Sequence, residues 1–233
     1  MSNCKPCSTP LCSNTKLSRF GGSLFSDVTL YRSTIGALQY LTNTRPDISF
    51  TANKLSQYLA ASTETHWKAC KRLLRYLKGI ASFGLLFKPA TEMHLAVYSD
   101  ADWDSCVDDS KSTSGCCVFL DGNLINWSSK KQTVVAHSST EAEYRALAQA
   151  CAEVLWVQSL FSELGLTVPS CAIIWCDNTS AASLAHNTVF HARTKHREID
   201  VHFIREKIAS KQLIVQYVPT ELQKADIFTK ALP

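Results

Sequence analysis

Four acidic residues of this chain occupy positions at which carboxylates can converge. Asp100 follows the run His-Leu-Ala-Val-Tyr-Ser, and Asp177 follows the run Ala-Ile-Ile-Trp-Cys. Both runs are short, rich in β-forming residues and bounded by turn residues, so each predicts a strand with a carboxylate at its C-terminal end. Glu143 lies in the first turns of a predicted long helix, and Asp226 lies near the start of a predicted last helix.

Carboxylates that meet at strand ends and helix starts form a cage of hard oxygen ligands. Such a cage suits Mg²⁺ and the chemistry of phosphate esters. Each acid also has a simpler interpretation. Asp100 and Asp177 are common residue types for the turn after a strand, and Asp226 would complement the dipole of its helix. The joint placement of all four favours a metal site.

Two glutamates compete for the place on the long helix. Successive helical residues turn by about 100°, so the side chains of Glu141 and Glu143 diverge by about 200°. Only one of them can face the strand ends, and the spacing does not choose between them. Glu141 is also spaced to form a surface ion pair with Arg145, four residues further along the helix.

The chain beyond residue 93 alternates between the sequence periods of strands and helices. Asp121-Gly122 separates two strand patterns and predicts a tight hairpin. The order β-β-β-α-β-α-α-β-α predicts an α/β domain with a mixed five-stranded sheet and helices on its faces. The strands are expected over 94–100, 115–120, 124–128, 172–176 and 213–218, and the helices over 139–164, from 178, over 194–209 and from about 222.

A small helical segment is predicted before this domain. Three helical patterns cover 31–42, 47–60 and 65–79, and Arg45-Pro46 separates the first two. Residues 1–25 are rich in Ser, Cys, Asn and Gly and show no period, so we expect them to lack a core. The expected organisation is a flexible lead-in over 1–25, a helical segment over 26–90 and the main domain over 93–233.

Composition and charge narrow the class of protein. The chain has 233 residues, 45% hydrophobic and 19% charged, as a globular protein does. No run is long and apolar enough for a membrane span, and ten cysteines without a secretory signal predict reduced thiols in the cytoplasm or nucleus. Residues 1–93 carry 12 basic and 4 acidic residues, whereas 94–233 carry 12 and 16. A basic part beside an acidic part fits a polyanion-binding surface next to a cation site.

Two basic clusters are candidates for contact with a nucleic acid. The helix over 65–79 places its basic residues opposite its apolar stripe, and a second cluster opens the helix over 194–209. A solvated helix face is the equally open alternative for the first cluster. The candidates are Lys68, Lys71, Arg72, Arg75 and Lys78 in the first cluster, and Arg193, Lys195, His196 and Arg197 in the second.

Longer sequence words identify a family resemblance. The words around the acids resemble the ribonuclease H region of copia-type retrotransposon Pol polyproteins, in family order. They are Ser99-Asp-Ala-Asp-Trp103, Lys111-Ser-Thr-Ser-Gly115, Trp127-Ser-Ser-Lys-Lys-Gln132, Ser138-Ser-Thr-Glu-Ala-Glu-Tyr-Arg-Ala-Leu147 and Ala225-Asp-Ile-Phe-Thr-Lys230. Upstream words, including Tyr31-Arg-Ser-Thr-Ile-Gly-Ala-Leu-Gln-Tyr-Leu41 and Arg72-Leu-Leu-Arg-Tyr-Leu-Lys-Gly79, resemble the end of that family's reverse transcriptase, so that 26–90 would be a remnant of its thumb or connection. Several long words in order are more specific than one short motif.

The resemblance implies a fold and an activity. It implies the ribonuclease H fold and hydrolysis of the RNA strand of an RNA–DNA hybrid, with two Mg²⁺ or Mn²⁺ ions held by the four acids. The family word around Glu143-Tyr-Arg-Ala selects Glu143 over Glu141. The implied partners are the hybrid and the remainder of the Pol polyprotein. The polymerase's Tyr-Val-Asp-Asp word is absent, so polymerisation is not expected of this chain alone.

Two rival functions have discriminating features. A decayed retroelement fragment would fold and bind nucleic acid without cutting it, and only an assay separates it from the enzyme. An integrase-type or resolvase-type nuclease shares the fold but lacks an acid at the place of Asp226. Cellular ribonucleases H carry a histidine in the loop before the last acid, and residues 218–225 of this chain contain none. That difference argues against histidine-assisted product release here.

Overall fold

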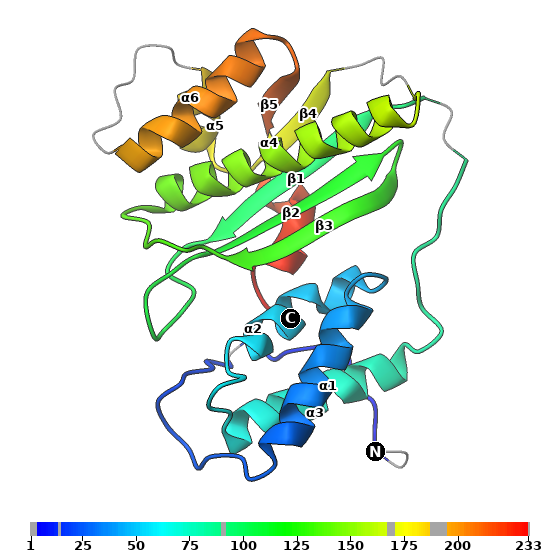
Figure 1. Ribbon diagram of the computed structural model, residues 1–233, viewed down its shortest axis with the longest axis vertical. Coiled ribbons are helices and arrows are strands. Elements are labelled where there is room, and N and C mark those ends of the chain that lie inside the picture. Colours follow the sequence, from blue (N-terminus) through cyan, green and yellow to red (C-terminus); the bar gives the residue numbers. More distant parts are fainter. Residues whose placement is uncertain (1–3, 14, 90–91, 167–170, 187–194, 233) are drawn as a thin grey trace.

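Two packed units make up the structure, a helical unit and an α/β unit (Figure 1). The computed structural model describes residues 4–13, 15–89, 92–166, 171–186 and 195–232, with the backbone alone for 195–198. Two separate clusters of buried apolar residues form the main cores, one in each unit. No helix in these described ranges is long and apolar enough to span a bilayer.

The helical unit follows the predicted breaks closely. It contains α1 (Val28–Leu41), the 3₁₀ helix η1 (Pro46–Ile48), α2 (Ser49–Ser56) and α3 (Glu64–Gly79). Asp27 caps α1 by accepting from the Leu30 N–H, and Thr63 caps α3. Pro46 ends the connection to α1 and opens η1, where its missing N–H costs nothing.

The α/β unit has the mixed five-stranded sheet that the sequence predicts. Its strands are β1 (Leu95–Asp102), β2 (Thr113–Leu120), β3 (Asn123–Lys131), β4 (Ala172–Cys176) and β5 (Leu213–Tyr217). The order across the sheet is β3-β2-β1-β4-β5, antiparallel from β1 to β3 and parallel from β1 to β5. Asp121 and Gly122 both adopt positive φ angles, 47° and 81°, which confirms the predicted tight hairpin.

Helices cover the two faces of the sheet unequally. The first face packs against α4 (Ser139–Glu163), α5 (Thr179–His186) and α6 (Lys195–Ala209). The second carries η3 (Lys224–Phe228), which the 3₁₀ helix η2 (Thr220–Leu222) precedes. The predicted last α-helix is therefore wrong in type. Gln223 is extended between the two 3₁₀ helices, and this interrupts the helical backbone so that η3 lies flat against β2.

The N-terminal residues differ from the expected lead-in without a core. Leu11 and Leu17 are 4% and 1% exposed and belong to the core of the helical unit. Basic side chains of α3 hold the preceding stretch by donating to it: Arg72 to the Thr9 hydroxyl (2.8 Å) and Arg75 to the Lys5 carbonyl (2.7 Å). These contacts are non-local, so a segment without sequence period still acquires a packed environment.

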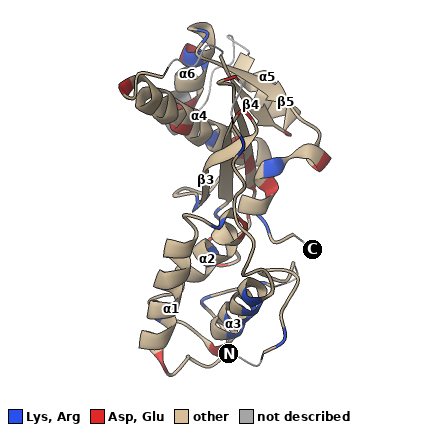
Figure 2. Ribbon diagram, turned by 90° about the vertical axis from the view of Figure 1, so that its right-hand side faces the viewer, with Lys and Arg blue, Asp and Glu red and all other residues tan. Residues whose placement is uncertain are grey.

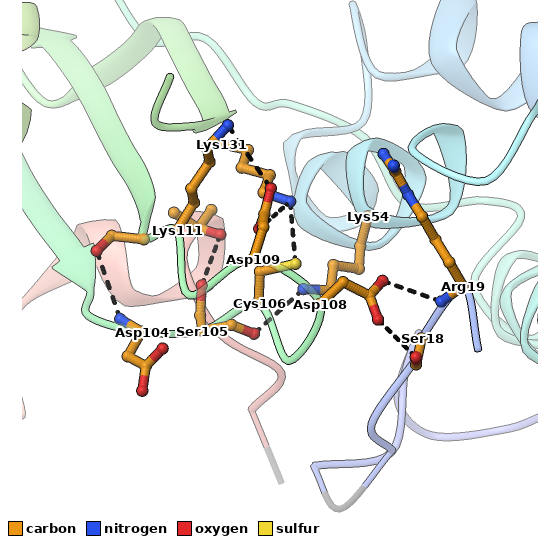
Figure 3. Close-up of polar contacts among 12 residues, drawn as sticks. Ser18, Arg19, Lys54, Asp104, Ser105, Cys106, Asp108, Asp109, Lys111 and Lys131 are labelled. Carbon is orange, nitrogen blue, oxygen red and sulfur yellow. Dashed lines mark hydrogen bonds and ion pairs between the residues drawn. The ribbon is translucent and has the colours of Figure 1, made fainter. Parts of the chain in front are cut away.

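Polar contacts join the helical unit to the sheet. The Trp127 indole N–H donates to the Thr42 carbonyl (2.9 Å), and the Asn53 amide donates to the Ser129 carbonyl (2.7 Å). The loop after β1 adds a second set (Figure 3): Lys54 Nζ donates to the Ser105 carbonyl (3.2 Å), and Asp108 accepts from Ser18 and Arg19. The helical unit therefore contacts both the sheet edge and the loop that leaves β1.

A substitution of Leu17 tests whether the N-terminal residues are part of the folded core. We expect Leu17→Ala to lower the free energy of unfolding by about 2–4 kcal/mol, because it leaves a cavity in the core of the helical unit. Leu24→Ala is the matched control, since Leu24 is 72% exposed and its truncation opens no cavity. Urea denaturation measures both. Equal and small decreases in the free energy of unfolding for the two variants would support the original prediction that residues 1–25 are a flexible lead-in.

Candidate metal centre

The ends of two neighbouring strands place the first two acids side by side. Parallel pairing between β1 and β4 ends at Ser99 and Cys176, and the next residues are Asp100 and Asp177. β1 runs on to Asp102 because β2 still pairs with it there, so Asp100 lies inside β1 but beyond the end of β4. Asp100 is 4% exposed, and the partly buried Asp177 accepts from the Thr220 hydroxyl (3.1 Å).

All four predicted acids come together at this point. One oxygen each of Asp100, Asp177 and Asp226 lies within 4.8 Å of the others. Glu143, Cys176 and Asp177 form a second such group, with the cysteine sulfur as its third atom. Asp177 belongs to both groups, and Asp100 also acts on Glu143, so the four acids form one cluster.

The structure also distinguishes the two glutamates of α4. Ser138 caps the helix by accepting from the Glu141 N–H, which fixes where its first turn begins. Glu143 points to the strand ends: its Oε1 accepts from the Ala101 N–H (3.2 Å). Glu141 forms the predicted pair with Arg145 (2.7 Å), but it is only 3% exposed, so its predicted surface position is wrong. Glu141 also accepts from the His137 N–H, which draws it into the loop before α4.

The fourth acid depends on how η3 docks on the sheet. Gln223 holds the start of η3: its Nε2 donates to the Ser99 carbonyl (2.9 Å) and its Oε1 accepts from the Ala225 N–H (3.1 Å). Gly115, which pairs with Asp100 across β1 and β2, gives η3 room to approach. A Cβ at Gly115 would lie 2.8 Å from the Phe228 Cβ and 2.7 Å from the Thr229 Cγ2. No local sequence pattern indicates these contacts, although Gly115 ends the motif Lys111-Ser-Thr-Ser-Gly115.

Two residues after η3 complete the surroundings of the acids. The fully buried Thr229 donates its hydroxyl to Asp100 Oδ2. Lys230 Nζ lies 2.9 Å from Asp226 Oδ1, and both side chains are partly buried. Both residues belong to the family motif Ala225-Asp-Ile-Phe-Thr-Lys230, but the motif by itself indicates a role for Asp226 alone.

Burial and neighbouring charges make Asp100 and Glu143 hard to ionise without a metal. Burial, with the charges of Asp100 and Asp177, raises the pKa of Glu143 to about 9. Burial is also the main cause that raises the pKa of Asp100 to about 6, against the opposing effects of Thr229 and Lys230. Burial alone would lower the pKa of Lys230, but its pairing with Asp226 and the nearby Asp100 raise it.

The donor set fits a hard divalent cation. Carboxylate oxygens are the preferred ligands of Mg²⁺ and Mn²⁺. Glu143 is 6% exposed, and its Oε2 has no hydrogen-bond partner among the residues that the structure describes. A buried carboxylate oxygen without a partner is costly unless a cation or a proton satisfies it. Asp100, Glu143, Asp177 and Asp226 are the residues that would hold the metal.

The candidate nucleic-acid contacts divide into exposed and occupied side chains. Lys68 and Lys71 are exposed on α3, where basic residues gather in the helical unit (Figure 2). Arg72, Arg75 and Lys78 instead donate to the N-terminal stretch, Lys78 to the Cys4 carbonyl (3.0 Å). Of the second cluster, Arg193 lies outside the described residues, and Lys195, His196 and Arg197 are placed by backbone only, in the first turn of α6.

Sequence comparison then decides the family. The chain is 46% identical over 232 residues to the retrovirus-related Pol polyprotein from transposon RE2 of Arabidopsis thaliana, and 47% identical over 232 residues to that from transposon RE1. It is 37% identical over 242 residues to the Pol polyprotein from transposon TNT 1-94 of Nicotiana tabacum. This chain belongs to the family of retrovirus-related Pol polyproteins. Each match covers the whole of this chain, but the chain spans only 16%, 16% and 18% of the length of the three relatives.

Solved structures add information on the fold of this Pol segment. A foamy viral protease-reverse transcriptase in complex with double-stranded DNA matches with a TM-score of 0.53, at 10% identity, over 86% of this chain and 33% of that one. Together with the strand order and the helices on its faces, this identifies the α/β unit as a ribonuclease H fold. No family model matches the chain.

The raised pKa values predict how stability depends on pH without metal. A folded-state pKa above the unfolded value means that the native protein binds extra protons, so the free energy of unfolding falls as pH rises. For Asp100 and Glu143 this window runs from about pH 4 to about pH 9. We expect Glu143→Gln to flatten this loss and to stabilise the metal-free protein at pH 8 by about 1–3 kcal/mol.

Denaturant titrations with EDTA at pH 5, 7 and 9 measure this effect. Glu163→Gln, at the exposed end of the same helix, is the matched control and should keep the pH dependence of the parent. A Glu143→Gln variant as pH-sensitive as that control would show that Glu143 is ionised at little cost.

Proposed function

We propose that this Pol segment is a ribonuclease H-type endonuclease, of the copia type, that hydrolyses the RNA strand of RNA–DNA hybrids with two Mg²⁺ or Mn²⁺ ions. The observation that carries the proposal is the shared position of Asp177. It lies in both groups of converging ligand atoms, one with Asp100 and Asp226 and one with Glu143. An acid shared between two adjacent groups is what two neighbouring cations need.

The residues of this chain have separate tasks in that reaction. Bound divalent cations would supply an activated water and stabilise the charge that develops on the leaving oxygen. Asp100 and Asp226 converge with Asp177 in one group, and Glu143 and Cys176 converge with Asp177 in the other. Thr229 fixes the orientation of Asp100 by donating its hydroxyl. The Ala101 N–H fixes one oxygen of Glu143 and leaves Oε2 free to bind.

The protonation of the site is part of its chemistry. Because burial raises the pKa of Glu143 and of Asp100, the metal-free site holds protons near neutral pH. Carboxylates bind cations in the ionised form, so loading the site releases protons and becomes easier as pH rises. The carboxylates are therefore more stable ionised with a cation bound than ionised without one.

Neutralising the shared and central acids tests the catalytic proposal. We expect Asp100→Asn and Asp177→Asn each to reduce cleavage of a uniform RNA–DNA hybrid by at least about 10³-fold, because the lost ligand acts in the transition state. Hybrid binding should be unchanged or tighter, since a negative charge near the polyanion is removed. Asp104→Asn, in the exposed turn after β1, should cut like the parent.

Cleavage in Mg²⁺ and in Mn²⁺ and hybrid binding by fluorescence anisotropy are the two measurements. A parent that binds the hybrid but cuts it in neither metal would favour the rival reading, an inactive relic that only binds nucleic acid.

We also propose that α3 contacts the phosphates of the hybrid through its exposed lysines. Each phosphate contact that is lost lowers the slope of log K against log salt by about one. We expect the double variant Lys68→Gln/Lys71→Gln to lower that slope by about 1.5–2 without loss of stability. Lys207→Gln/Lys211→Gln, at the end of α6 in the other unit, is the control with the same charge change.

Arg72→Gln/Arg75→Gln separates this role from a structural one. These arginines hold the N-terminal stretch, so the variant should lose stability in urea denaturation. An unchanged salt slope in Lys68→Gln/Lys71→Gln would show that the basic face of α3 is only solvated.

A further inference from the structure

One cation of the chain itself reaches the acidic cluster. Lys230 Nζ lies 2.9 Å from Asp226 Oδ1, with the lysine side chain 38% and the aspartate side chain 18% exposed. Among the ion pairs of the described residues, this is the pair that involves one of the four acids. Arg145 of α4 pairs with Glu141, on the side of the helix that faces away from Glu143.

The backbone fixes Lys230 at this place. Lys230 follows Asp226 by four residues, and its N–H donates to the Asp226 carbonyl (3.1 Å). The neighbouring residue Thr229 is fully buried and contacts Asp100, which anchors the same turn to β1. Contacts that do not involve its charge therefore fix the backbone of Lys230 beside the cluster, and the ion pair with Asp226 places its ammonium group.

The carboxylate that Lys230 contacts is also one that a metal would use. Asp226 belongs to the group formed with Asp100 and Asp177. An ammonium at hydrogen-bond distance from a carboxylate oxygen blocks the approach of a divalent cation and repels it. Lys230 and a cation on the Asp226 side therefore compete for the Asp226 carboxylate.

We propose that Lys230 is a tethered cation that neutralises the acidic cluster in the metal-free protein and competes with the divalent ion on the Asp226 side. The inference rests on the proposed function in that it takes the cluster to be a metal site. It adds that a residue of the chain itself lowers the affinity of the site for a divalent cation. The repulsion of the acids is relieved before the metal arrives, and part of the binding free energy is spent on displacing the ammonium.

The alternative is that the pair is an ordinary surface ion pair between residues four apart. Such pairs contribute little, and their removal changes stability slightly wherever they occur. Removing the lysine of an ordinary surface pair should change metal affinity no more than removing Lys224 does. Competition, in contrast, predicts that removing the lysine charge tightens metal binding, which is the opposite of what a damaged site would do.

Calorimetric titration of MnCl₂ alone into the metal-free protein tests the proposal. We expect Lys230→Gln to bind Mn²⁺ roughly threefold to tenfold more tightly than the parent on the Asp226 side. Lys230→Arg keeps the charge and should bind like the parent. Lys224→Gln is the control with the same charge change in the adjacent turn, because Lys224 lies over the rings of Tyr98 and Phe119 and outside the cluster. Mn²⁺ affinity of Lys230→Gln equal to or weaker than that of the parent would overturn the proposal.

Thermal melting of the same metal-free proteins is a second readout. Lys230→Gln should melt at a lower temperature than Lys224→Gln at low ionic strength, and added Mn²⁺ should close the gap. A gap that Mn²⁺ leaves unchanged would show a purely structural lysine and would also overturn the proposal. Failure of the proposed function looks different: Lys230→Gln would shift the Mn²⁺ affinity while neither protein cleaves the hybrid. If both proteins cleave the hybrid and bind Mn²⁺ with identical affinities, the proposed competition by Lys230 is wrong and the proposed nuclease activity stands.

Discussion

The close approach of four carboxylates, two of them buried, is the constraint around which this structure is organised. Burial and the neighbouring charges raise the pKa of Glu143 and of Asp100, so these two are costly to ionise. The fold holds them together regardless, with Asp100 and Asp177 at adjacent strand ends, Glu143 on α4 and Asp226 on η3. Four elements from distant parts of the chain are therefore fixed against an unfavourable electrostatic interaction. The scaffold must be rigid where the carboxylates meet, because relaxation would separate them.

The contacts beside the acids show how this rigidity is achieved. Gln223 joins η3 to β1 through one side chain, and Gly115 lets η3 approach β2 closely. Thr229 and the Ala101 N–H each hold one carboxylate oxygen. None of these groups carries a charge, so they orient the acids without adding to the repulsion. Lys230 is the exception, since it supplies charge as well as position.

Sequence patterns predicted the parts of this arrangement that depend on local order. Alternation, the Asp121-Gly122 turn and the cap before α4 are short-range signals, and they located the strands, the hairpin and the start of α4. The choice of Glu143 over Glu141 needed the family resemblance. The docking of η3 could not be predicted because it depends on two contacts between residues more than a hundred positions apart in the chain. Gln223 contacts Ser99 of β1, and Gly115 of β2 contacts the residues at the end of η3. The core role of Leu17 was missed for a similar reason, since an isolated apolar residue has no period.

The count of charged residues was also a limited guide to which side chains are available to a partner. The excess of basic residues before residue 94 predicted a polyanion surface, but a count does not reveal the partners of each side chain. Arg72 and Arg75 bind the N-terminal stretch, so the charge that α3 offers to solvent is smaller than its composition suggests. The same stretch contributes Ser18 and Arg19, which hold the loop that leaves β1 through Asp108. Arg72 and Arg75 thus bind the chain itself, and the N-terminal stretch that they hold contacts, through the Ser18 hydroxyl and the Arg19 backbone N–H, the loop that follows the strand carrying Asp100.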